Sequence, residues 1–85
     1  MDETRENRIK RMRMRSMRRG IKEMDLILSE YAGRHLDTMD DAGLDLYDAL
    51  LEENDQDLYR WVTGQEAPPP ALAGLVTEIS QVFQK

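Results

Sequence analysis

The residues best suited to binding another molecule are Arg18 and Arg19, which stand directly before Gly20 and close to Glu23. Guanidinium groups form strong hydrogen bonds with carboxylates, so this element suits recognition of opposite charges on a partner. If Arg19 and Glu23 lay on one helix, their ion pair would contribute only about 0.3 kcal/mol. Gly20 can bend the backbone or let another surface approach the main chain. The element is therefore either a weak internal ion pair or a binding site.

Positive charge is concentrated around this element in a chain that is otherwise acidic. Residues 1–23 carry nine Lys or Arg and four Asp or Glu, whereas residues 24–85 carry three and thirteen. From Arg8 to Arg19, seven of twelve residues are basic. Such a run is typical of proteins that bind nucleic acids, membranes or acidic partners. Because phosphates would repel the acidic remainder, a protein partner with an acidic or mixed surface is favoured.

Two alternative functions remain open for the basic segment. One is binding of RNA or DNA, in which arginines at helical spacings would contact phosphates: Arg8, Arg11, Arg15 and Arg18. Aromatic residues for base stacking are absent from the segment, so no nucleic acid is predicted as the partner. The other alternative is a generic helical adaptor for an unrelated protein.

Residues that could perform catalysis or hold a metal ion are few. His35 is the only histidine, and we expect it in a loop, as a solvated side chain with no nucleophile beside it. The acidic runs at 40–41 and 52–57 lack the pattern of a calcium loop, and helix capping explains them. Gly20 belongs to neither a Walker loop nor a dinucleotide fingerprint. The sequence therefore predicts no enzyme, no catalytic residue and no metal site.

Length and composition predict one small domain, residues 1–85. A chain of this size buries roughly 60–65% of its unfolded surface, which leaves little room for a buried active site. Cysteine is absent, and no apolar stretch approaches the roughly 18 residues of a membrane span. The start, Met1-Asp2-Glu3, resembles neither a signal peptide nor a transit peptide. We therefore expect a bacterial protein in the cytoplasm, without membrane insertion.

Apolar spacing predicts the elements that position these residues: an all-α, compact single-domain bundle of five short helices. The first helix is weakly amphipathic, with Ile9, Met12 and Met17 as its apolar points, and the acids Asp45, Asp48 and Glu52 are expected to face water. The helices are expected at about 5–18, 20–32, 40–53, 56–63 and 70–84. The expected core comprises Met24, Ile27, Leu28, Tyr31, Leu44, Tyr47, Leu50, Leu51, Leu58, Trp61, Val62, Leu72, Leu75, Val76, Ile79, Val82 and Phe83.

Turn and capping residues indicate where these helices begin and end. Gly33 and Gly64 are expected to end the second and fourth helices. Asp40 and Asp55 are suited to cap the third and fourth. The prolines at 68–70 predict a stiff link into the last helix, because proline is favoured at the first helical position.

Two short motifs resemble a known protein family. The first is Arg19-Gly20-x-x-Glu23 followed by Met24-Asp25, and the second is Asp55-x-Asp57-Leu58-Tyr59-x-Trp61 with Gly64 before the prolines. In this order and separation they are similar to the bacterial FAD assembly factors of succinate dehydrogenase, which have a mitochondrial counterpart. The resemblance runs from about Arg11 to Pro69. It implies a compact five-helix fold, in agreement with the helix pattern.

The resemblance also implies a function. Members of the family bind the flavoprotein subunit of succinate dehydrogenase, and often that of fumarate reductase, and promote covalent attachment of FAD to a histidine of that subunit. His35 is therefore not implicated. We expect an assembly factor that is a monomer when free, holds no cofactor stably itself and acts on FAD attachment in its partner. The predicted partner-binding residues are Arg19, Gly20 and Glu23 with Arg18, Arg15 and Asp57.

The resemblance is incomplete in the first helix. Relatives often carry an aromatic residue shortly before the arginine pair, whereas this chain has Met14 and Met17 there. Methionine is flexible and suits either an adaptable contact or ordinary core packing. In the second motif, Leu58 and Trp61 are expected in the core.

Overall fold

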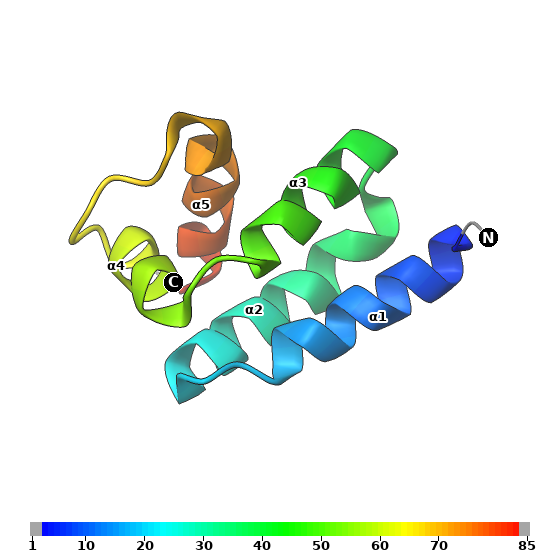
Figure 1. Cartoon of the computed structure of the whole chain (residues 1–85), viewed down its shortest axis with the longest axis horizontal. Coiled ribbons are helices and arrows are strands. Elements are labelled where there is room, and N and C mark those ends of the chain that lie inside the picture. Colours follow the sequence, from blue (N-terminus) through cyan, green and yellow to red (C-terminus); the bar gives the residue numbers. More distant parts are fainter. Residues whose placement is uncertain (1–2, 84–85) are drawn as a thin grey trace.

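The structure is a computed structural model that describes residues 3–83, with side chains as far as Val82. Over this range the chain forms five α-helices, one short 3-10 helix and no strand (Figure 1). The predicted all-α fold of five helices is confirmed. The elements are α1 (Arg5–Met17), α2 (Lys22–His35), η1 (Leu36–Thr38), α3 (Asp41–Leu51), α4 (Asp55–Val62) and α5 (Pro70–Phe83).

Helix α2 lies at the centre of the bundle. It runs antiparallel beside α1 and also contacts α4 and α5 (Figure 1). Helix α3 contacts α1 and α5, so it joins the first helix pair to the last. This arrangement brings the turn between α1 and α2 against the start of α4, although 36 residues separate Arg19 from Asp55 in sequence.

Polar side chains begin three of the helices. Thr4 accepts a hydrogen bond from the backbone N–H of Asn7 at the start of α1. Asp40 does the same for Gly43 at the start of α3, as predicted. The predicted cap of α4 is wrong by one residue, because Asn54 accepts the hydrogen bond from Gln56 N and Asp55 is already helical. The carboxylate of Asp55 is thereby available for another contact.

The two glycines expected to end helices behave differently. Gly64 has a φ of 83° just after α4, a left-handed conformation that glycine adopts without steric cost, so the predicted end is correct. Gly33 does not end α2, which continues to His35. The expectation that His35 lies in a loop is therefore wrong. The His35 ring packs against Tyr31, with ring centroids 4.5 Å apart.

The core is formed by the predicted apolar stripes of all five helices. Met17 is an exception, since 57% of its surface is exposed, whereas Ile9 and Met12 are buried. The prediction for the Phe83 side chain lies outside the described side chains. Leu36 of η1 joins the core. The stripes found buried are Met24, Ile27, Leu28 and Tyr31 of α2, Leu44, Tyr47, Leu50 and Leu51 of α3, Leu58, Trp61 and Val62 of α4, and Leu72, Leu75, Val76, Ile79 and Val82 of α5.

A buried pair of hydroxyl groups fixes α1 against α3. The Ser16 hydroxyl donates to the Met12 carbonyl at 2.8 Å and lies 2.6 Å from the Tyr47 hydroxyl. Because the only proton of Ser16 is already used, Tyr47 donates to Ser16. Burial raises the pKa of Tyr47 to about 12. The pair satisfies two polar groups that would otherwise be costly to bury.

No helix in residues 3–83 combines the length and apolar character that crossing a bilayer requires.

Candidate functional site

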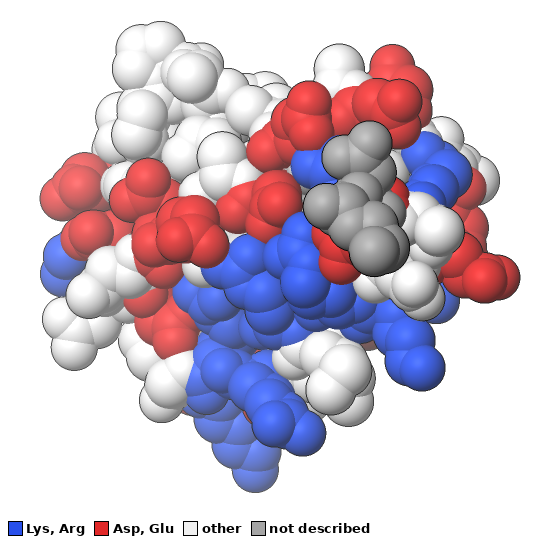
Figure 2. Space-filling view, turned by 45° about the vertical axis from the view of Figure 1, so that its right-hand side comes forward, with Lys and Arg blue, Asp and Glu red and all other residues white. Residues whose placement is uncertain are grey.

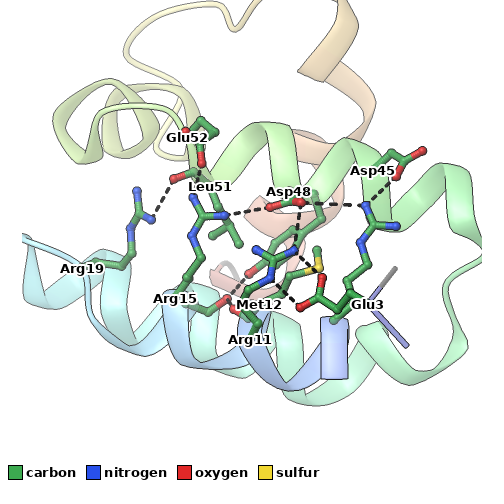
Figure 3. Close-up of polar contacts among 12 residues, drawn as sticks. Glu3, Arg11, Met12, Arg15, Arg19, Asp45, Asp48, Leu51 and Glu52 are labelled. Carbon is green, nitrogen blue, oxygen red and sulfur yellow. Dashed lines mark hydrogen bonds and ion pairs between the residues drawn. The ribbon is translucent and has the colours of Figure 1, made fainter. Parts of the chain in front are cut away.

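The arginine element lies in the turn between α1 and α2, and Asp55 of α4 holds it in place. Arg19 Nε donates to Asp55 Oδ1 at 2.6 Å. The other two guanidinium nitrogens donate to the backbone carbonyls of Leu51 at 3.1 Å and Glu53 at 3.0 Å, and Figure 3 shows the contact with Leu51. Only 10% of the Arg19 side chain and 16% of the Asp55 side chain are exposed. Arg19 is therefore an internal anchor of the turn.

Gly20 belongs to the same anchor. Its backbone N–H donates to the other carboxylate oxygen of Asp55. A side chain at this position would place a Cβ atom 3.1 Å from that oxygen, closer than most Cβ contacts in proteins. Positive φ is not the reason for this glycine, since Gly64 is the only described residue with that conformation. The group that approaches the Gly20 backbone closely is therefore the carboxylate of Asp55 in the same chain.

The remaining charged groups of the element point to solvent. Arg18 and Glu23 are exposed, and neither forms an ion pair with any part of the chain between residues 3 and 83. The internal ion pair considered for Arg19 and Glu23 is absent, because Arg19 pairs with Asp55 instead. Glu23 lies in the first turn of α2, where the helix dipole favours a carboxylate. Gly20 is thus flanked by exposed charged side chains that form no ion pair within residues 3–83: Arg18 before it, and Lys22 and Glu23 after it.

Arg15 belongs to a second group of contacts, between α1 and α3. Its two terminal nitrogens lie 2.8 Å from Asp48 and 2.5 Å from Glu52 (Figure 3). Arg11 lies 2.9 Å from Glu3 and 3.3 Å from Asp48, and Arg8 pairs with Asp45. Glu3 and Asp48 raise the pKa of Arg11 above its usual range. The prediction that these acids face water holds for Asp45 and Glu52, which are both 71% exposed, and is wrong for Asp48, which is 28% exposed.

Asp57, predicted from the second motif, lies two residues after Asp55 on α4 but is not part of the anchor. Its carboxylate pairs with Arg60 of the same helix at 2.6 Å. Both side chains are about two-fifths exposed, so this pair contributes little to stability. Trp61 and Leu58 are buried in the core, as expected.

The structure thus brings together some predicted site residues and separates others. Arg19 and Gly20 meet at Asp55, a residue of the second motif that the sequence predicts as a helix cap and not as a binding residue. Arg18 and Glu23 flank this anchor on the surface, whereas Arg15 and Asp57 are used in other ion pairs. Among the described residues, no group of three or more acidic or histidine side chains is arranged to hold a metal ion.

Comparison with known proteins shows which family the chain belongs to. Residues 10–83 match the model of a family described as the flavinator of succinate dehydrogenase. The chain is 51% identical over 84 residues to "Succinate dehydrogenase assembly factor 2, mitochondrial" of Meyerozyma guilliermondii, covering 98% of this chain and 62% of the relative. It is 35% identical over 74 residues to "FAD assembly factor SdhE" of Legionella pneumophila, covering 87% of this chain and 94% of the relative.

A third relative, the mitochondrial assembly factor 2 of Danio rerio, is 36% identical over 78 residues, covering 89% of this chain and 49% of the relative. The chain spans less than two thirds of the length of these mitochondrial relatives but nearly all of the Legionella protein. The resemblance found in the two motifs is confirmed: the chain belongs to the family described as the flavinator of succinate dehydrogenase.

Proposed function

We propose that this chain is an assembly factor that binds the flavoprotein subunit of succinate dehydrogenase and promotes covalent attachment of FAD to it. The observation that carries the proposal is the match to the Legionella protein named as an FAD assembly factor, which extends over 94% of that protein. The anchored turn supports it, because Gly20 and the exposed charges of Arg18 and Glu23 form a ready binding surface. The flavoprotein subunit of fumarate reductase is included as a second partner.

The six proposed binding residues would act in different ways. Arg18, Gly20 and Glu23 would contact the flavoprotein directly. Arg19 would be a positioning residue, because its guanidinium is already bonded to Asp55 and to two carbonyls. The other two would lie at the edge of the interface and would keep their ion pairs within this chain, Arg15 with Asp48 and Asp57 with Arg60.

The factor needs no catalytic group of its own in this proposal. By binding the attachment-competent arrangement of the flavoprotein more tightly than other arrangements, it would increase the population of that arrangement. The flavin chemistry itself would be supplied by FAD and the histidine of the partner. The start of α2 is poorly suited to the FAD pyrophosphate, since Gly20 N–H already faces the Asp55 carboxylate and Glu23 lies in the first turn. We therefore propose no stable cofactor on this chain.

We further propose that the factor acts as a monomer in the bacterial cytoplasm, without inserting into the membrane or binding nucleic acid. The strongest support concerns nucleic acid. Three of the four arginines that would have to contact phosphates already pair with carboxylates of α3: Arg8, Arg11 and Arg15. Phosphate contacts would require these pairs to open.

The test is Glu23→Gln in a strain that lacks the endogenous factor and expresses the flavoprotein subunit. Covalent flavin is measured by in-gel fluorescence of the denatured subunit. Because Glu23 is exposed and unpaired with any residue in 3–83, its replacement should leave the fold intact while reducing flavin attachment by about fivefold or more. Glu6→Gln is the matched control, since Glu6 is also an exposed carboxylate in the first turn of its helix.

Two results would contradict this proposal. If deleting the wild-type factor left the covalent flavin of the subunit unchanged, the proposed function would be wrong. If the wild-type factor restored flavin attachment but Glu23→Gln restored it equally, the function would stand and the role of Glu23 would be wrong. Circular dichroism of both variants checks that the fold is retained.

A further inference from the structure

The outer face of α1 carries a shallow groove of about 600 Å³. Figure 2 shows a large patch of Lys and Arg side chains, with acidic side chains above it and along its left side. The groove is lined by Asn7, Lys10, Arg11, Met14, Arg15, Arg18 and Arg19.

The charges in this groove are not equivalent. Arg11, Arg15 and Arg19 each pair with carboxylates of this chain. Lys10 and Arg18 are exposed and form no ion pair with residues 3–83. They are eight positions apart, about 12 Å along a helix axis, so both can contact one ligand.

An apolar side chain lies between these two cations. Met14 is four residues from each, lines the same groove and is 46% exposed. A flexible thioether surrounded by cations suits contact with an apolar side chain of a partner. The groove therefore offers three neighbouring positions along α1 and the residue that follows it, in the order cation, apolar, cation.

We propose that this groove binds an acidic peptide segment of the flavoprotein subunit, with carboxylates on Lys10 and Arg18 and an apolar side chain on Met14. The inference rests on the proposed function and extends the interface from the turn along α1. Complementary charge of this kind guides association and fixes the orientation of the partner. Arg18 joins the two regions, because it lines the groove and is also next to the anchored turn.

A peptide fits these features better than a nucleic acid does. The acidic side chains along the border of the patch and the formal net charge of −5 would repel a long phosphate backbone but would tolerate a short acidic segment. The lining contains no aromatic ring for base stacking.

The test measures binding of the purified flavoprotein subunit to the immobilised full chain at 50 and 200 mM salt. Lys10→Gln should weaken Kd about two- to fivefold at low salt and less at high salt, as expected for an exposed ion pair. Met14→Gln should weaken Kd by at least threefold, whereas Met14→Leu and Lys10→Arg should bind like the wild type. Arg34→Gln, which removes an exposed arginine from α2, is the control for net charge.

The outcomes distinguish a wrong groove assignment from a wrong proposed function. If the wild type binds the subunit but Lys10→Gln and Met14→Gln bind equally well, the groove assignment is overturned and the proposed function stands. If the wild type does not bind the subunit, both are overturned. The groove assignment also fails if Arg34→Gln weakens binding as much as Lys10→Gln, or if a 20-nucleotide single-stranded RNA binds the wild type more tightly than the subunit does.

Discussion

Replacing Asp55 with asparagine tests the anchored turn most directly. The two carboxylate oxygens of Asp55 accept from two different donors, Arg19 Nε and Gly20 N. Asparagine has the same shape but only one acceptor oxygen, so one of these donors would face the amide NH₂ instead. The substitution also leaves the buried Arg19 guanidinium without its counter-charge.

The energy of this change follows from the burial of the pair. A hydrogen bond to a charged group contributes about 1.5–3 kcal/mol, and loss of one partner from a buried ion pair costs still more. With both side chains of the pair less than one-fifth exposed, we expect Asp55→Asn to lower the free energy of unfolding by about 2–3 kcal/mol. That is a large part of the roughly 4–13 kcal/mol typical of 85 residues, and corresponds to a fall in Tm of about 10–20 °C.

Urea unfolding followed by circular dichroism measures this loss. Asp57→Asn is the matched control two residues away, because its ion pair with Arg60 is more exposed and should contribute less than about 0.5 kcal/mol. The Gly20 amide proton should also exchange faster with solvent in Asp55→Asn than in the wild type. A stability within 0.5 kcal/mol of the wild type, with unchanged exchange at Gly20, would refute the anchor.

Three further predictions concern the rest of the fold. Gly33→Ala should raise the free energy of unfolding in urea by about 0.5–1 kcal/mol, because Gly33 is helical and no atom lies within 4 Å of the added Cβ; a loss would contradict this. Asp48→Asn should lower the free energy of unfolding by about 1–2 kcal/mol at low salt, and by less at 1 M salt, because Asp48 contacts three arginines of α1. An equal decrease at both salt concentrations would argue against ion pairing. Raising the pH from 9 to 11 should lower the free energy of unfolding by about 1 kcal/mol through Tyr47. Its pKa of about 12 exceeds the unfolded value, so stability present below pH 10 is lost toward pH 12, and Tyr47→Phe should remove this share of the slope.

The helices could be predicted from the sequence because their core stripes are regular. In α3, Leu44, Tyr47, Leu50 and Leu51 repeat every three or four residues, and all are buried. The end of α2 was placed too early because glycine is a common helix terminator. At Gly33 the helix continues, since tertiary contacts of α2 outweigh a helix propensity cost of about 1 kcal/mol.

The contact between α1 and α3 was missed although its pattern is present in the sequence. The arginines at 8, 11 and 15 and the acids at 45, 48 and 52 share the spacing i, i+3, i+7, so each set lies on one helical face. Amphipathic analysis assigns such a face to solvent. No local sequence pattern indicates that the basic face of α1 and the acidic face of α3 lie against each other, because this contact depends on which helices pack together.

The role of Asp55 was missed for a related reason. Asn54 and Asp55 are both good helix caps, and the sequence alone does not decide between them. In the structure Asn54 caps α4, and Asp55 accepts from Arg19 and Gly20. The two motifs, which are separate in sequence, therefore meet in one structural unit.

This unit limits how the turn can act on a partner. Withdrawing Arg19 to bind the flavoprotein would leave the carboxylate of Asp55 unpaired in a site that is mostly buried, at a cost of several kcal/mol. A partner that contacts Gly20 and Glu23 needs no such change, and it meets a turn that is already ordered, which reduces the entropy lost on binding. Loss of function in an Arg19 variant is therefore expected to come from a disordered turn. A stabilising change elsewhere, such as Gly33→Ala, should recover only about 0.5–1 kcal/mol of its stability, without recovering flavin attachment.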